Sequence, residues 1–134
     1  MSRVDEAVFH LMRRVLQEHG ARWQAKLPNL TKPQYAVLVV IDEGEEVDQA
    51  TVGQQAAIDK ATLAGLMLRM EQRGLITRTV GADRRRRILR LTEAGREVLA
   101  EAKEVADEVN GSMLARLDEP EHNQLRGLLT KLTA

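Results

Sequence analysis

The stretch RMEQRGLITRTVGADRRRRILRLT, residues 69–92, decides the fold. Gly74 stands where the helix that precedes it needs a left-handed residue at its C-terminal end. Two strand-like runs follow, residues 75–80 and 86–91, and a Gly-Ala-Asp turn separates them. The stretch therefore predicts a helix that leads directly into a β-hairpin, with four consecutive arginines near the hairpin tip.

Two short helices are expected directly before this hairpin. Asp48 can cap a helix over residues 49–57, and Asp59 can cap a second helix over residues 60–73. The tight turn between them, around Ile58, has the spacing of a helix-turn-helix. A helix-turn-helix followed by a hairpin is a winged helix, whose second helix enters the major groove of DNA by its N-terminal residues.

Helices are also expected on the N-terminal side of this unit. Apolar residues at three- and four-residue spacing predict one long amphipathic helix from Asp5 to about Lys26. Thr31 and Gln34 form a capping box for the next helix, which should end near Gly44. A short connector leads from there to the helix-turn-helix, so the predicted winged-helix lobe spans residues 31–96.

Beyond the hairpin the sequence predicts two more helices. Thr92 starts a long charged helix that we expect to loosen near Asn110-Gly111, and Asp118 caps a final helix with a leucine stripe. The stripes at both ends of the chain are too apolar for the surface of a small monomer, which usually marks an interface. The expected fold class is mostly α with a small β-hairpin wing, in a single domain over residues 1–134.

Charge is distributed unevenly along the chain. The formal net charge is zero, but residues 59–96 carry ten Lys or Arg against four Asp or Glu. The remaining residues must therefore carry a matching negative charge. One basic segment on an acidic body is the pattern expected where a single surface meets a polyanion such as DNA. Chance clustering of solvated arginines is the alternative.

Composition excludes several functional classes. There is no cysteine, which excludes disulfides, cysteine–zinc sites and thiol nucleophiles. The chain also lacks an HExxH motif, a Gly-rich phosphate loop and a Ser-His-Asp arrangement, and its three histidines make no metal-site signature. We therefore expect no enzyme activity, no cofactor and no resident metal. With no apolar run long enough for a membrane span and no signal peptide, a cytoplasmic protein is expected.

The predicted DNA contacts come from the second helix of the pair and from the hairpin. The hairpin tip can place Arg84 or Arg85 in the minor groove, whose negative potential attracts arginine. Strand alternation would turn the next two arginines to opposite faces, so that one reaches phosphate. Arg69 could contact phosphate or brace the hairpin through Asp83. The candidate DNA-binding residues are Lys60, Thr62, Arg69, Arg84, Arg85, Arg86 and Arg87.

Several motifs occur in a fixed order along the chain: LTKPQYAVL (30–38), DKATL (59–63), RMEQRGLITR (69–78), and DRR (83–85) before LTEAG (91–95). This series resembles MarR-type transcription regulators. The resemblance implies a homodimeric winged-helix repressor that binds a pseudo-palindromic operator in double-stranded DNA. It also implies that the terminal helices, residues 5–27 and 98–133, interlock with those of a partner chain.

Two positions depart from the family pattern. Many members carry a polar or basic residue at the position of Gly65 and an acidic or polar residue at the position of Leu68. Base readout by this helix is therefore expected to be sparser, resting on Lys60, Thr62 and Asp59.

Aromatic residues and histidines gather near the N-terminus. His19 lies in the middle of the first helix's apolar stripe, and Trp23 follows one turn later on the same face. Two readings stay open at this point: a core histidine with satisfied hydrogen bonds beside a core tryptophan, or a site for a planar ligand.

Residues 10–23 and 47–53 further resemble the MarR-type regulators that sense aromatic carboxylates such as hydroxybenzoates. This resemblance implies that Arg13 pairs with the ligand carboxylate and that His19 contacts the ring substituents. Arg13 lies roughly 120° from His19 around the helix, so both line one pocket only at a packing corner or across a dimer. The candidate effector residues are Arg13, His19, Trp23, Tyr35 and His10, the last on the opposite side of the helix.

Two alternatives to an aromatic effector remain open. The first is a winged-helix DNA-binding protein that has no small-molecule ligand. The second is a metal effector bound by His19 together with Glu18 or His10.

Overall fold

The computed structural model describes the backbone of residues 3–134, and the side chains of all of these except residues 4–6. The elements in chain order are α1 (Arg3–Lys26), α2 (Lys32–Glu43), β1 (Val47–Asp48), α3 (Gln49–Ala56), α4 (Lys60–Gln72), β2 (Ile76–Val80), β3 (Arg87–Leu91), α5 (Glu93–Leu114) and α6 (Glu119–Leu132).

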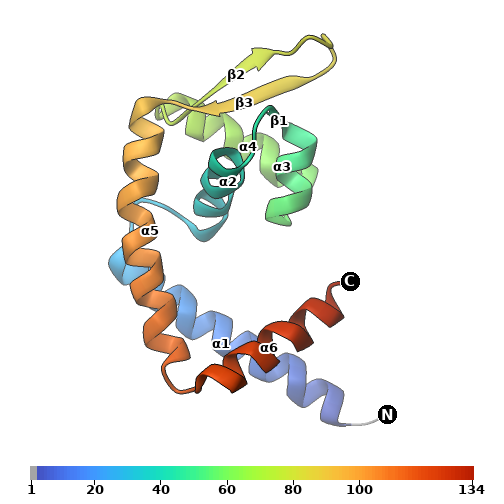
Figure 1. The fold of residues 1–134 in the computed structure, drawn as a ribbon, viewed down its shortest axis with the longest axis vertical. Coiled ribbons are helices and arrows are strands. Elements are labelled where there is room, and N and C mark those ends of the chain that lie inside the picture. The colour runs from blue at the N-terminus through green and yellow to red at the C-terminus, as the bar shows by residue number, and fades with distance from the viewer. Residues whose placement is uncertain (1–2) are drawn as a thin grey trace.

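The fold is a winged helix with helical extensions. Helices α2, α3 and α4 pack under a three-stranded antiparallel sheet of order β1-β3-β2 (Figure 1). The β2–β3 hairpin projects from this lobe as the wing, and α5 leads away from it toward α1 and α6. The predicted fold class and helix order are confirmed.

The connector before α3 forms the third strand. Val47 pairs with Leu89 and Asp48 with Ile88, so β1 adds to β3 on the side opposite β2. This pairing satisfies backbone groups of β3 on both of its edges. It also places Asp48, the N-cap of α3, beside the base of the wing.

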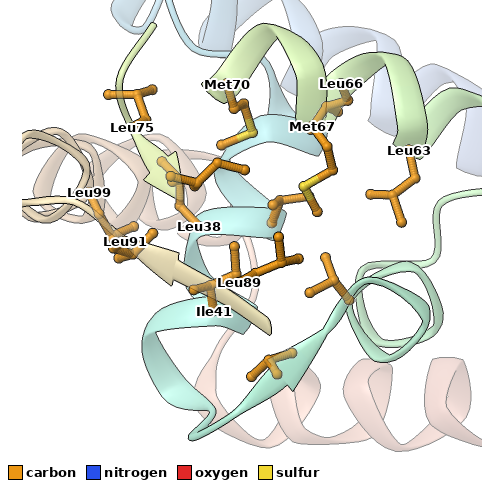
Figure 2. Packing of buried hydrophobic residues seen from close by; sticks show 14 of the residues in the cluster. Leu38, Ile41, Leu63, Leu66, Met67, Met70, Leu75, Leu89, Leu91 and Leu99 are labelled. Atoms are coloured by element: carbon orange, nitrogen blue, oxygen red, sulfur yellow. The ribbon is translucent and has the colours of Figure 1, made fainter. Parts of the chain in front are cut away.

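The core lies between α2, α4 and the sheet. Leu38 on α2 and Met67 and Met70 on α4 are fully buried, and Leu89 and Leu91 on β3 point toward them (Figure 2). The spacing of the buried residues along α4 is that of an amphipathic helix with one face inward. The core therefore fixes which face of α4 remains outside.

One junction ties the wing to α5. Gly74 has φ +73° and ends α4, and the Leu75 N–H donates to the Met70 carbonyl at 3.0 Å, as in a Schellman motif. The Thr92 hydroxyl donates to the Gly74 carbonyl at 2.6 Å, and the Thr92 N–H donates to the Leu75 carbonyl at 3.0 Å. Thr92 is also the N-cap of α5, so one residue joins three elements.

Gly95 makes this junction possible. A Cβ atom at residue 95 would collide with the carbonyl oxygen of Leu75. The first turn of α5 therefore packs directly on the backbone that links α4 to β2. Its buried position in the LTEAG motif reflects this close approach.

Two sequence predictions are wrong in detail. The long helix does not loosen near Asn110-Gly111, because α5 continues without interruption to Leu114. Packing of α5 against α1 outweighs the low helix propensity of an Asn-Gly pair. The return strand begins at Arg87 rather than Arg86, because the Arg86 N–H closes the wing turn on the Asp83 carbonyl.

The terminal helices carry apolar side chains that the chain itself does not cover. The α1 and α6 helices lie toward the end of α5 that is farther from the wing (Figure 1). Large exposed apolar residues on them are Val8, Phe9, Leu11, Val15 and Leu16 on α1, and Leu125, Leu128, Leu129 and Leu132 on α6.

Replacing Gly95 with alanine tests the junction. Gly95→Ala should lower the free energy of unfolding by about 2 kcal/mol, because the added methyl group meets a backbone oxygen that cannot move away. Urea unfolding at fixed protein concentration measures the change. Gly65→Ala is the matched control. A Cβ atom at residue 65 meets no atom within 4 Å, and alanine favours the helix more than glycine does, so this variant should be at least as stable as the wild type. A Gly95→Ala protein as stable as the wild type would contradict the close approach.

Candidate nucleic-acid interface and effector site

The N-terminus of α4 is held by its own cap. The Asp59 Oδ1 atom accepts the Thr62 N–H at 2.9 Å, and Oδ2 accepts the Thr62 hydroxyl at 2.8 Å. Hydrogen bonds from the Thr62 backbone and hydroxyl hold the pKa of Asp59 below its ordinary value. Ala57, with φ +58°, makes the tight turn from α3 into this cap.

The predicted DNA contacts on α4 are all solvent-accessible. Lys60, Thr62 and Arg69 are exposed. The Arg69 side chain makes no hydrogen bond or ion pair with the residues that the structure describes. Among the described residues, Arg69 makes no ion pair with Asp83, because the Asp83 carboxylate accepts the Arg85 N–H within the wing turn.

The wing tip is closed by bonds within the turn. The Asp83 Oδ1 atom accepts the Arg85 N–H at 3.1 Å, and the Asp83 carbonyl accepts the Arg86 N–H at 2.9 Å. The Arg87 guanidinium adds a third bond, because its Nη1 donates to the Arg84 carbonyl at 3.0 Å. Asp83 therefore braces the turn by accepting hydrogen bonds from backbone N–H groups.

Arg86 anchors the base of the wing. Its Nε donates to Asp48 Oδ2 at 3.0 Å, and its Nη2 donates to the Glu46 carbonyl at 3.4 Å. Asp48 also caps α3 through the Thr51 N–H at 2.8 Å. Hydrogen bonds from Thr51, and then Arg86, hold the pKa of Asp48 below its ordinary value. The carboxylate thus links the wing to the first helix of the pair.

A second arginine ties the wing to both helices of the pair. Arg78 on β2 pairs with Glu71 of α4, Nε to Oε1, at 2.6 Å. Its Nη1 donates to Gln49 Oε1 on α3 at 3.1 Å. The sequence alone did not predict the Arg86–Asp48 or Arg78–Gln49 hydrogen bonds, because the partners lie 38 and 29 residues apart in the chain.

The four consecutive arginines therefore divide into two pairs. The guanidinium groups of Arg86 and Arg87 donate hydrogen bonds to other residues of the chain. Those of Arg84 and Arg85 are exposed and make no hydrogen bond with the described residues. The tip thus presents two cations on a braced turn that projects from the lobe (Figure 1). This is the arrangement expected of a surface that meets the phosphate backbone and the minor groove.

A second polar cluster lies where α1, α2 and α5 meet. His19 Nε2 is 2.7 Å from Asn110 Oδ1 on α5, and its Nδ1 is 3.2 Å from the Lys32 Nζ at the start of α2. An ammonium group can only donate and an amide oxygen can only accept. With these partners the Nε2–H group would donate to Asn110 and Nδ1 would accept from Lys32.

Two aromatic rings adjoin His19. The Trp23 ring centroid lies 5.9 Å from that of His19 and 5.1 Å from that of Tyr35, the latter in an edge-on arrangement. Trp23 is buried, and its indole N–H donates to the Leu30 carbonyl at 2.7 Å. Burial, and then the Asp107 carboxylate, raises the pKa of Tyr35 above its ordinary value, which keeps the phenol neutral.

The structure brings three of the five predicted effector residues together. His19, Trp23 and Tyr35 form one cluster, whereas Arg13 and His10 lie exposed on the part of α1 that extends away from it. Lys32 and Asn110 join the cluster and were missed. Asn110 is exposed and follows Val109, the last residue of the buried stripe of α5, so no local spacing signalled its contact with His19.

The comparisons with known proteins decide the family. The MarR family model matches residues 29–87. The transcriptional regulator HosA of Escherichia coli is 43% identical over 92% of this chain and 93% of its own length.

The chain belongs to the MarR family. Solved structures of relatives share its whole architecture. A probable transcriptional regulator from Pseudomonas aeruginosa is 36% identical, with a TM-score of 0.88 over 97% of this chain and 99% of that one. BpsR of Bordetella bronchiseptica, whose DNA binding is regulated by 6-hydroxynicotinic acid, is 32% identical, with a TM-score of 0.89 over 94% and 92%.

Family membership makes this chain a MarR-type winged-helix transcriptional regulator rather than an enzyme. Within the part of the chain that the structure describes, no group of three His, Asp or Glu side chains is placed to hold a metal ion. No helix among the described residues is long and apolar enough to span a membrane.

The division of the arginines predicts their effects on DNA binding. Arg84→Ala and Arg85→Ala should each weaken binding to a duplex selected from a random library. Each should also lower the slope of log affinity against log salt by about one per wing, because a phosphate contact is lost. Fluorescence anisotropy over a salt series measures both quantities.

Arg116→Ala, an exposed arginine between α5 and α6, is the matched control and should leave affinity and slope unchanged. Unchanged salt slopes in both tip variants would show that the wing does not contact the DNA backbone.

Proposed function

We propose that this MarR-family regulator is a homodimeric repressor that a small aromatic carboxylate releases from a pseudo-palindromic operator. The observation that carries the proposal is the cluster of His19, Lys32 and Asn110 against Trp23. It joins α1, α2 and α5, and so lies between the winged lobe and the terminal helices.

The chemistry of the cluster suits an aromatic acid. Lys32 supplies a half-buried ammonium group for a carboxylate, and the His19 imidazole can form a hydrogen bond with a ring hydroxyl. Trp23 and Tyr35 supply aromatic faces and edges for a planar ring. BpsR supports the same class of effector, because 6-hydroxynicotinic acid is a hydroxylated aromatic carboxylic acid.

In this proposal, the Arg13 side chain that contacts the effector comes from the partner chain. It lies on the exposed, apolar part of α1, away from its own chain's His19 cluster. In a dimer that interlocks through the terminal helices, residues 5–27 and 98–133, Arg13 of each chain would approach the cluster of the other. Two cations, Lys32 and Arg13, would then face one effector.

Release from DNA follows from a population shift. An effector that contacts Lys32, His19 and Asn110 touches the start of α2 and the C-terminal part of α5 at once. It favours the conformations in which those elements make these contacts best. In a dimer, these conformations would set the distance between the two winged lobes. If that distance does not fit the operator, effector binding weakens DNA binding, and DNA binding weakens effector binding by the same coupling free energy.

A charge on the exposed stripe of α1 tests dimerisation. Leu16 is 61% exposed in the single chain, so Leu16→Glu costs little there but would bury a carboxylate in the dimer. Sedimentation velocity should show a dimer for the wild type and a monomer for Leu16→Glu. Val80→Glu, at 57% exposure on the wing, is the matched control and should remain dimeric. A monomeric wild type would refute the dimer.

Calorimetric titration with 4-hydroxybenzoate, protocatechuate and benzoate tests the effector. Lys32→Met and Arg13→Ala should each weaken binding of the preferred acid at least about tenfold, the usual cost of losing a hydrogen bond to a charged group. The same acid should dissociate the wild-type protein from its DNA. Arg14→Ala removes an equally exposed arginine that lies about 100° from Arg13 around α1, and is the matched control.

A MarR-family regulator without a small-molecule effector is the second candidate. Trp23 is buried at 5% exposure, and both ring nitrogens of His19 already have partners within the chain. A cluster so satisfied can serve packing alone. No measurable binding of any of the three acids to the wild type would favour this candidate. Undiminished binding by both variants would instead place the acid at another site and refute the His19 cluster as its pocket.

A further inference from the structure

The stripe of α4 directly opposite its buried residues carries almost no hydrogen-bonding side chain. The buried residues of this helix are Leu63, Leu66, Met67 and Met70. At about 100° per residue, the stripe directly opposite them consists of Ala61, Gly65, Leu68 and Gln72. Only Gln72, in the last turn, can form a hydrogen bond through its side chain.

The polar groups at the start of α4 are occupied by each other. Both carboxylate oxygens of Asp59 accept hydrogen bonds from Thr62, one from its N–H and one from its hydroxyl. The Thr62 hydroxyl proton is therefore not available to a base without breaking the cap. Lys60 remains as a donor in this turn, at the side of the stripe.

Positive charge surrounds this apolar stripe. Arg69 and Arg73 lie on the same helix, Lys60 flanks its start, and Arg84 and Arg85 occupy the tip of the neighbouring wing. A polyanion with apolar groups on its surface complements both properties.

We infer that α4 reads its operator mainly through the 5-methyl groups of thymine, with Leu68 and the small residues Ala61 and Gly65 as the reading surface. The inference rests on the proposed function, in which α4 occupies the major groove. There the thymine methyl is the one apolar group that a base pair presents, and apolar side chains contact it.

Small and large side chains on the stripe have different roles in this inference. A Cβ atom at Gly65 would meet no protein atom within 4 Å, so the fold does not require glycine there. The small residues 61, 64 and 65 let the helix backbone approach the bases closely. Leu68, with 52% of its surface exposed, is the one large apolar side chain on the helix that reaches outward.

Deoxyuridine substitution tests the inference directly. A binding duplex is first selected from a random library, and each thymine is then replaced by deoxyuridine, which lacks only the 5-methyl group. Affinity should fall about fourfold at each contacted position, the factor that corresponds to one buried methyl or methylene group. The methyl lies in the major groove, so contacts of the wing in the minor groove stay unchanged.

Leu68→Ala identifies the reader. In this variant the penalty for deoxyuridine should vanish at the positions that Leu68 contacts and persist at the others. Because Leu68 is exposed, its truncation should leave the unfolding midpoint unchanged. A penalty that is the same in both proteins at every position would overturn the role of Leu68.

Gly65→Ala separates the fold from the interface. The added methyl should keep or raise the unfolding midpoint, yet weaken DNA binding about tenfold by holding the helix off the bases. Unchanged affinity of this variant would overturn the close approach.

The failure of this inference differs from the failure of the proposed function. Binding within about twofold for thymine and deoxyuridine duplexes at every position, with a steep salt dependence retained, overturns thymine readout alone. Loss of salt-dependent binding to any selected duplex overturns both, because α4 would then not occupy a major groove.

Discussion

The carbonyl oxygens of Gly74 and Leu75 meet the first turn of α5, and the positions of the other elements depend on that contact. Thr92 binds both carbonyls while it caps α5, and Gly95 allows the helix to approach the backbone without a clash. The end of α4, both wing strands and the start of α5 thereby converge at one point. A change in the direction of α5 would move the recognition helix and the wing together, which is what a regulator needs to transmit a distant event to its DNA-binding surface.

Positive charge serves two purposes in this lobe. Arg78 and Arg86 hold the hairpin to α3 and α4 through Glu71, Gln49 and Asp48. Both ion pairs are partly solvated, so each contributes little to global stability but restricts the angle of the wing. The arginines at the tip then face outward on a frame that is already fixed. The predicted DNA contacts at the tip are thus oriented by the arginines behind them.

The His19 cluster contacts α5 at Asn110, near the C-terminal end of the helix, whereas the wing junction lies at its N-terminal end. Asn110 and His19 connect α5 to α1, and Lys32 connects α1 to the start of α2. These contacts are polar and few, so an effector can replace them at low cost. The apolar core beneath the sheet, in contrast, has no such replaceable contacts and keeps the lobe rigid.

Local patterns in the sequence determined the helices, their caps and the wing. Thr31, Asp48 and Asp59 act as the predicted N-caps, and Gly74 takes the predicted left-handed conformation, because each depends on neighbours within a few residues. The tertiary structure alone decided the Arg86–Asp48 bond, the inclusion of Lys32 and Asn110 in the His19 cluster, and the continuity of α5 through Asn110-Gly111. These features join residues far apart in the chain, and their free energy comes from partners that no local spacing reveals.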